Sequence, residues 1–294
     1  MGSPLFVFVF EEIRLRSSLF LIALLLSSAG CRDAREIGRQ SNADSGVPQV
    51  SSSSATVAAS SLSGEGEGKA VTFEDNEEQD GGSREFKYSW PATVGAQADL
   101  AEKLDAERRE ALAKQKSEWG DALAKCPGDS VGCKSRGYGK EWKVVADLPR
   151  WLSLSADIYD YQGGAHGNYT RQSLVWDKQD KRAFAGKDLF QSAVALENAL
   201  GERLCDALDR ERQRKRGAPV ERSNEWSTDC PGIDEASVFV GSSNGETFDR
   251  IGVYFGPYVA GAYAEGAYEL DFPVTASVVD AVKREFASAF SVKR

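Results

Sequence analysis

The spacing of apolar residues predicts two kinds of element in the part of the chain after residue 85. Between 96 and 125, apolar side chains return at multiples of three to four residues, which predicts a long helix with one buried face. The members of this stripe are Leu100, Leu104, Leu112, Trp119 and Leu123. Between 151 and 161, apolar and polar residues alternate, which predicts a half-buried strand. Related patterns predict further strands at 86–90, 142–146 and 169–177.

A second apolar stripe predicts another long helix, from residue 188 to the glycine at 217. Its members, at steps of three and four, are Leu189, Ala193, Leu196, Leu200, Leu204 and Leu208. Strands are expected at 236–240, 249–255 and 268–272, and an amphipathic helix at 274–290. Because strands and helices come in runs, we expect an α+β fold with antiparallel strands, two long helices and a C-terminal helix. We expect it to form two small subdomains, 85–185 and 186–294.

The N-terminal part has the features of an export signal. Two arginines, Arg14 and Arg16, precede the apolar run 19–26, and small residues then lead to Cys31. The run is far shorter than the about 20 residues that a membrane-spanning helix needs. The stretch resembles the bacterial lipobox, whose cysteine becomes acylated. We therefore expect a lipoprotein signal peptide at 1–30 and a palmitate-type lipid anchor on Cys31. An ordinary secretory signal with a chance cysteine is the alternative.

The segment 31–84 is rich in serine, glycine and acidic residues, and it buries too little apolar surface to offset the entropy of ordering. We expect it to be a disordered linker. With a lipid anchor, the chain is placed in the cell envelope, facing the periplasm. Arg32 stands where an aspartate retains some lipoproteins in the inner membrane, which favours the outer membrane.

Four cysteines remain beside Cys31, and in an oxidising compartment an even number predicts disulfides. They are Cys126, Cys133, Cys205 and Cys230. Four cysteines allow three connectivities, of which we expect the pairing of sequence neighbours. A structural metal site is the alternative, but the cysteines form no CxxC pairs and lack nearby histidines. We expect no metal and no other cofactor.

The charge and the histidine content narrow the classes of function. A formal net charge of −9 repels phosphate backbones, so nucleic acid is not expected as a partner, whereas basic proteins are favoured. The single histidine, His166, excludes chemistry that needs two or three imidazoles.

Two glycine-rich segments carry the candidate site: YDYQGGAHGNY at 159–169 and FGPYVAGAYAEG at 255–266. Their expected contact residues are Tyr161, Gly163, Gly164, His166, Gly167, Tyr258, Tyr263 and Glu265, and Tyr169 adds another aromatic tip. One interpretation is a glycine turn whose histidine bonds the backbone, and another is a surface that contacts a ligand or protein. A third is a catalytic site in which His166 acts as base or single metal ligand beside Glu265 or Asp160. The sequence contains no HExxH, P-loop or dinucleotide motif.

The GGAHG turn, the later GPYVAGAYAEG segment and a strand ending in Phe272-Pro273 together resemble a bacterial envelope domain of unknown function. This domain occurs in PdaC-type peptidoglycan deacetylases, outside their catalytic part, and in RsiV-type anti-sigma factors, which sense lysozyme. The resemblance covers about 86–290 and implies a two-part α+β fold, with a later part like a subdomain of the heat-shock chaperone ATPases.

The sequence shows neither the metal ligands of the deacetylase module nor a transmembrane helix, so the resemblance implies neither deacetylation nor anti-sigma activity. It implies a non-catalytic binding module that contacts lysozyme, peptidoglycan or another envelope protein. The alternative is a small envelope hydrolase that uses His166 and Glu265.

Overall fold

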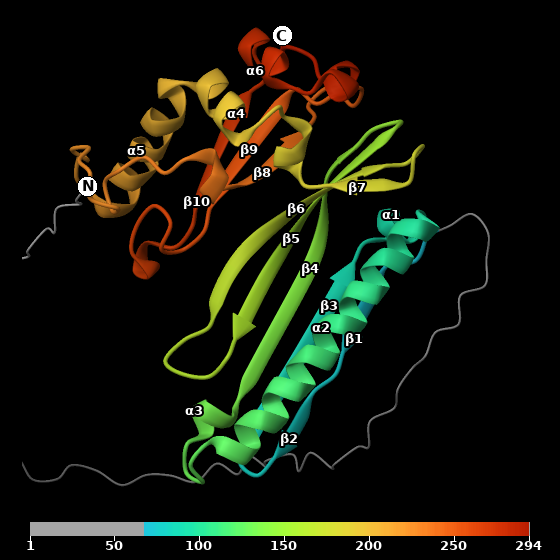
Figure 1. Ribbon diagram of the computed structural model, residues 1–294, viewed down its shortest axis with the longest axis vertical. Helices are drawn as coiled ribbons and strands as arrows, with labels where there is room; N and C mark the ends of the chain where they lie inside the picture. The colour runs from blue at the N-terminus through green and yellow to red at the C-terminus, as the bar shows by residue number, and fades with distance from the viewer. Residues whose placement is uncertain (1–67, 294) are drawn as a thin grey trace, which may run out of the picture. The chain divides into compact units, whose positions relative to one another are not determined.

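Two β-sheets, of seven and three strands, organise residues 68–293, which the computed structural model describes (Figure 1). The predicted signal peptide, Cys31 and the linker up to residue 67 lie outside the described residues. Among the helices of 68–293, the search for an apolar segment of membrane-spanning length found none. The structure confirms the predicted α+β class.

The seven-stranded sheet has the order β1-β3-β4-β5-β6-β7, with β2 paired to β3. Its strands are β1 (Val71–Glu74), β2 (Glu77–Gln79), β3 (Gly82–Trp90), β4 (Arg136–Asp147), β5 (Trp151–Tyr161), β6 (Asn168–Asp177) and β7 (Arg182–Phe184). All pairs are antiparallel except β3–β4, which are parallel because a crossover joins them. That crossover comprises α1 (Ala92–Gly95), α2 (Ala98–Lys125) and α3 (Val131–Lys134).

Helix α2 lies along one face of the large sheet (Figure 1). Its buried stripe includes Leu100 and Leu104, as the periodicity predicted, and they pack on Tyr88, Trp142 and Leu154. The ring N–H of Trp142 donates to the Tyr88 hydroxyl across 3.0 Å, so the one polar group of this core tryptophan is satisfied.

The predicted disordered linker extends too far, because residues 71–84 belong to the sheet. Phe73 packs edge-on against Phe86, with ring centroids 6.1 Å apart. The side chain of Arg84 is only 1% exposed and pairs with the Asp75 and Glu77 carboxylates. Two of the acidic residues that suggested a solvated linker therefore neutralise a buried arginine.

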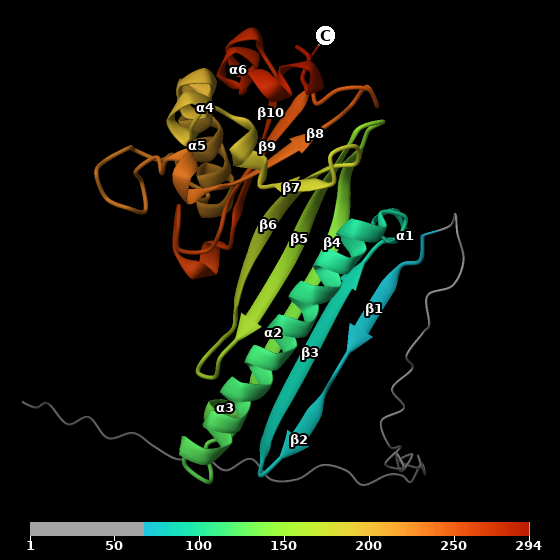
Figure 2. The ribbon, with the colours of Figure 1, turned by 45° about the vertical axis from the view of Figure 1, so that its right-hand side comes forward.

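The small sheet has the order β10-β9-β8 and is antiparallel. Its strands are β8 (Ser237–Gly241), β9 (Arg250–Phe255) and β10 (Tyr268–Pro273). Helices α4 (Ala193–Leu200), α5 (Glu202–Arg216) and α6 (Ala276–Ala281) lie on its side away from the large sheet (Figure 2). Short 3-10 helices complete this part: η1 (Gly186–Leu189), η2 (Ile233–Glu235), η3 (Tyr263–Glu265) and η4 (Arg284–Ala289).

The predicted helices at 188–216 and 274–290 are both interrupted, the first into η1, α4 and α5 and the second into α6 and η4. Phe190 and Val282 form an isolated antiparallel bridge, and the Lys283 amide donates to the Leu189 carbonyl across 2.9 Å. This pairing holds both segments extended, so α4 begins only after Ser192, and η4 only after Lys283. Gly201, with φ of 58°, then separates α4 from α5.

The two sheets share a hydrophobic core. Strand β8 contacts β4, β5 and β6 on the face opposite α2. Ala146, Trp151 and Val175 of the large sheet join the apolar residues of α4, α5 and the small sheet. Residues 68–293 belong to one compact unit, and the predicted division into subdomains at residue 185 stays a prediction.

Both predicted disulfides are present. Cys126–Cys133 closes the loop between α2 and α3, with Cα atoms 5.8 Å apart, and Cys205–Cys230 ties α5 to the segment before η2, at 5.5 Å. Two disulfides indicate an extracellular or periplasmic compartment, because cytosolic thiols are kept reduced.

Candidate functional site

The structure brings the two glycine-rich segments into contact. The turn 162–167 joins β5 to β6, and the segment 256–267 joins β9 to β10. The rings of His166 and Tyr263 stack with centroids 4.0 Å apart, and the Tyr263 hydroxyl donates to the Gly167 carbonyl across 2.6 Å. The two motifs therefore form one surface.

Four tyrosines and the histidine form this surface, which we call the tyrosine cluster: Tyr159, Tyr169, Tyr258, Tyr263 and His166. Tyr169 and Tyr258 lie 6.1 and 5.5 Å from the Tyr263 ring, between centroids. Tyr258 is 55% exposed, Tyr159 46% and Tyr169 37%, so the cluster presents aromatic rings to solvent. Exposed tyrosines offer a large contact area at a low cost in side-chain entropy.

Several residues of the two glycine-rich segments have backbone conformations or close contacts that limit which side chains they can carry. A Cβ on Gly167 would lie 2.4 Å from the outer end of the Tyr159 ring, so any larger residue would have to displace that ring. Gly163 and Gly164 have φ values of 90° and 105°, which glycine adopts readily. Tyr258 has φ of 70°, a conformation that costs a tyrosine of order 1–3 kcal/mol. The fold thus holds this exposed ring in place against an unfavourable backbone.

Some predicted site residues serve the scaffold. The Tyr161 hydroxyl donates to the Gly164 carbonyl across 2.9 Å, and it also lies 3.4 Å from the Gly132 carbonyl beside the first disulfide. Gly163 lies against the same loop. Sequence reasoning left out Tyr159 as a contact residue, although its place two residues before Tyr161 puts both on one face of β5.

The Glu265 carboxylate has hydrogen-bond partners other than His166. Its carboxylate accepts from the Arg216 guanidinium across 2.8 Å, from the Tyr268 hydroxyl, and from the Ala262 amide across 3.2 Å. Burial acts to raise the pKa of this carboxyl, but the hydrogen bonds from Arg216 and Tyr268 outweigh it and leave the pKa below its usual value. Glu265 is therefore an ionised anchor for the loop.

Basic side chains near the C-terminal end of α5 donate hydrogen bonds to backbone carbonyls in the rest of this loop. Arg212 is fully buried and donates twice to the Ala260 carbonyl, across 2.7 and 2.9 Å. Lys215 donates to the carbonyls of Glu265 and Ala267 across 2.8 and 2.5 Å. Three cations of one helix thus set the position of the segment that carries Tyr258 and Tyr263.

The substitution Glu265→Gln is expected to lower the free energy of unfolding at pH 7 by about 1–3 kcal/mol, because the charge-assisted bonds are lost. The folded-state pKa of Glu265 is depressed, so its contribution is present above about pH 4.5 and is lost as the pH falls through the folded pKa. Urea unfolding of both proteins at pH 7 and pH 3 measures this. A stability gap that does not narrow at pH 3 would contradict the anchoring role.

These features define an α+β, disulfide-bonded domain with an exposed aromatic surface. A family model described as "Deacetylase PdaC" matches residues 77–169, from β2 to the start of β6. The match includes the GGAHG turn and confirms the resemblance to a PdaC-type domain for this segment. The 255–266 segment lies outside it.

Two solved structures of the DUF3298 family are similar to the chain. The protein from Bacteroides fragilis is 18% identical, with 70% of this chain and 89% of that chain covered and a TM-score of 0.40. The protein from Pseudomonas aeruginosa is 15% identical, with 76% and 97% covered and a TM-score of 0.42. The search of curated proteins gave no match.

Proposed function

We propose that this protein is a lipid-anchored, non-catalytic binding module of the cell envelope, and that the tyrosine cluster is its contact surface. The observation that carries the proposal is the meeting of the two glycine-rich segments in one exposed aromatic patch. Tyrosine is enriched among the residues that dominate binding energy at protein interfaces. Tyr258 is held in this patch despite an unfavourable backbone conformation.

The partner that we favour is a basic envelope protein such as lysozyme. The chain carries a formal net charge of −9, so it attracts a cationic protein at low ionic strength. Peptidoglycan and other envelope proteins are the remaining partners that the resemblance implies, and the experiment below separates them from lysozyme.

The anchor is the acylated Cys31 at the end of the signal sequence. The linker that follows then extends to about residue 70, since the sheet begins at Val71. It tethers the domain to the membrane on the periplasmic side, in the outer membrane by the sorting rule that Arg32 satisfies. Metabolic labelling with a palmitate analogue, and its loss in Cys31→Ser, tests the anchor separately from binding.

The hydrolase alternative requires Glu265 or Asp160 to act with His166. The Glu265 carboxylate instead binds Arg216 and Tyr268, and the Asp160 carboxylate accepts from the Gln162 amide across 2.8 Å. Nothing in this geometry favours catalysis over binding, so binding is the function that we put forward.

Equilibrium binding of the oxidised full chain to lysozyme at two salt concentrations tests the proposal. We expect saturable binding that weakens with salt. Tyr258→Ala and Tyr263→Ala are each expected to weaken binding by at least about tenfold, as for residues at the centre of an interface. Val194→Ala on α4 is the matched control, because it trims an equally exposed apolar side chain elsewhere (63%), and it should bind as the parent does.

Absence of binding at tens of micromolar would overturn the lysozyme proposal, and equal binding by all four proteins would overturn the tyrosine cluster as its contact surface. Co-sedimentation of the same proteins with purified peptidoglycan sacculi then decides whether the tyrosine cluster serves the cell wall. Pelleting that is lost in Tyr258→Ala and Tyr263→Ala would place the glycan or its peptide on the cluster.

A further inference from the structure

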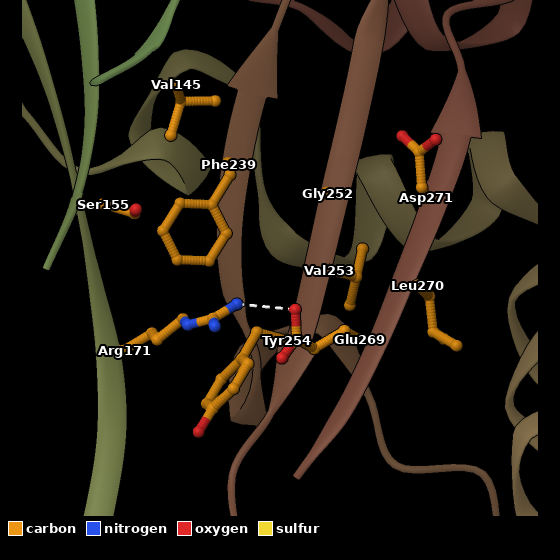
Figure 3. A pocket seen from close by; sticks show the side chains of 10 residues that line it. All are labelled: Val145, Ser155, Arg171, Phe239, Gly252, Val253, Tyr254, Glu269, Leu270 and Asp271. Atoms are coloured by element: carbon orange, nitrogen blue, oxygen red, sulfur yellow. Dashed lines mark hydrogen bonds and ion pairs between the residues drawn. The ribbon is translucent and has the colours of Figure 1, made fainter. Parts of the chain in front are cut away.

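A cleft lies between the two sheets beside the tyrosine cluster. It consists of two adjacent cavities of about 270 and 410 Å³ that share Arg171, Tyr254 and Glu269 as lining residues. Arg171 extends from β6, and Tyr254 and Glu269 come from β9 and β10 (Figure 3). Small-molecule sites in proteins typically measure about 300–1,000 Å³, so the cleft is large enough for a ligand of a few rings.

Most charged groups that line this cleft take part in ion pairs, whereas Lys215 donates to the carbonyls of Glu265 and Ala267. The Arg171 guanidinium binds Asp157 across 2.5 Å and Glu269 across 2.6 Å. Lys143 binds Asp157 across 2.8 Å, and Arg250 pairs with Asp271. The cleft and its ion-pair partners therefore carry cations and carboxylates in similar numbers, although the chain as a whole is acidic.

Asp157 and Arg171 stay ionised at neutral pH. Burial acts to raise the pKa of the Asp157 carboxyl, but the hydrogen bonds from Lys143 and Arg171 leave it below its usual value. Burial acts to lower the pKa of Arg171, and the bonds to Asp157 and Glu269 more than compensate. A strongly charged ligand would have to break these pairs, whereas a neutral polar ligand has only to share their free lone pairs and N–H groups.

Two tyrosine rings lie beside the ion pairs in the lining of the cleft. The Arg171 guanidinium lies over the Tyr254 ring, 5.3 Å from its centroid, so this ring and the ion pair form one wall. Tyr169, which is 37% exposed, lines the larger cavity and also belongs to the tyrosine cluster. Flat rings suit the apolar C–H face of a sugar, and paired carboxylates and guanidinium groups suit its hydroxyls.

We propose that this cleft binds an uncharged oligosaccharide, with Arg171, Glu269 and Asp157 bonding its hydroxyls and Tyr169 packing on a sugar ring. The site adjoins the tyrosine cluster but does not depend on the binding of a basic protein. The same chemistry is offered by a free oligosaccharide and by a glycan strand of the cell wall.

Isothermal titration of the oxidised full chain with chitotetraose, a neutral N-acetylated tetrasaccharide, tests the site. We expect saturable binding that is weakened about tenfold or more in Glu269→Ala, a variant that removes an exposed side chain and should still fold. Glu246→Ala is the matched control, because it deletes an exposed carboxylate in the β8–β9 loop, outside the cleft lining. Cellotetraose, which lacks the N-acetyl groups, shows whether hydroxyls alone suffice.

Three outcomes would overturn the proposal. They are no heat at about 10 mM sugar, tighter binding of the cationic deacetylated tetrasaccharide than of the neutral one, or equal binding by Glu269→Ala and its control. Binding that is lost in Tyr258→Ala but kept in Glu269→Ala would move the sugar to the tyrosine cluster. If the parent protein co-sediments with sacculi and Glu269→Ala does not, the natural ligand is a glycan strand of the cell wall. Because lysozyme binding is measured in a separate titration, failure of one proposal leaves the other standing.

Discussion

Replacing Arg212 by methionine is expected to cost about 3–5 kcal/mol of folding free energy and to loosen the loop that carries Tyr258. The Arg212 side chain is fully buried, and its guanidinium is bound by the Ala260 carbonyl and, at 3.3 Å, by Asp209. Methionine fills similar space but leaves the Ala260 carbonyl and the Asp209 carboxylate without this partner, and breaking a buried pair from one side has a cost of this size.

Urea unfolding measures the stability, and amide hydrogen exchange at 257–266 reports on the loop. Arg214→Met is the matched control on the same helix, because Arg214 is 67% exposed and pairs with Glu211 alone among the described residues. The control should change stability by less than about 1 kcal/mol. If the two variants are equally stable, or if exchange in 257–266 is unchanged in Arg212→Met, the loop is not held by this arginine.

Replacing Gly186 by alanine is expected to destabilise the protein by about 3 kcal/mol, because the two sheets touch at this residue. A Cβ there would lie 1.9 Å from the Val238 carbonyl oxygen of β8, and backbone atoms have no alternative rotamer. The Gly186 amide also donates to the Ser173 hydroxyl of β6 across 2.9 Å, so the segment has little room to move.

Gly120→Ala gives the opposite expectation within the same protein. Gly120 lies inside α2 with no atom within 4 Å of its added Cβ, so alanine should stabilise by about 0.5–1 kcal/mol through helix propensity. Paired denaturation curves measure both changes. If Gly186→Ala is as stable as the parent, then β8 and the segment between β7 and η1 can move apart to make room for the added methyl group.

Local periodicity was enough to predict the longer strands and the first helix, but not the short strands β1, β2 and β7. Strand β5 has the predicted bounds, and α2 begins two residues later than expected. Such patterns succeed where one face of an element is buried along its whole length. The broken helices escaped prediction because the Phe190–Val282 bridge joins residues far apart in the sequence, and no local pattern encodes such a contact.

The sequence predicted the two motifs of the candidate site, but not the roles of the charged residues around them. The two motifs that the sequence singled out do meet, through His166 and Tyr263. The roles of Glu265 and Arg212 depend on which residues lie opposite them in the fold, and the sequence shows only that they are charged. The cleft around Arg171 was not foreseen either, because its walls come from β5 and β6 in one sheet and β9 and β10 in the other.

The connectivity of the disulfides has a consequence for biogenesis. The bridged cysteines are consecutive in the chain, with sequence separations of 7 and 25. An exported chain that is oxidised in the order in which its cysteines leave the translocation channel therefore reaches the native pairing directly, without disulfide isomerisation. This order requires that Cys31, which emerges first, be withdrawn from oxidation, and the proposed acylation of its sulfur does so.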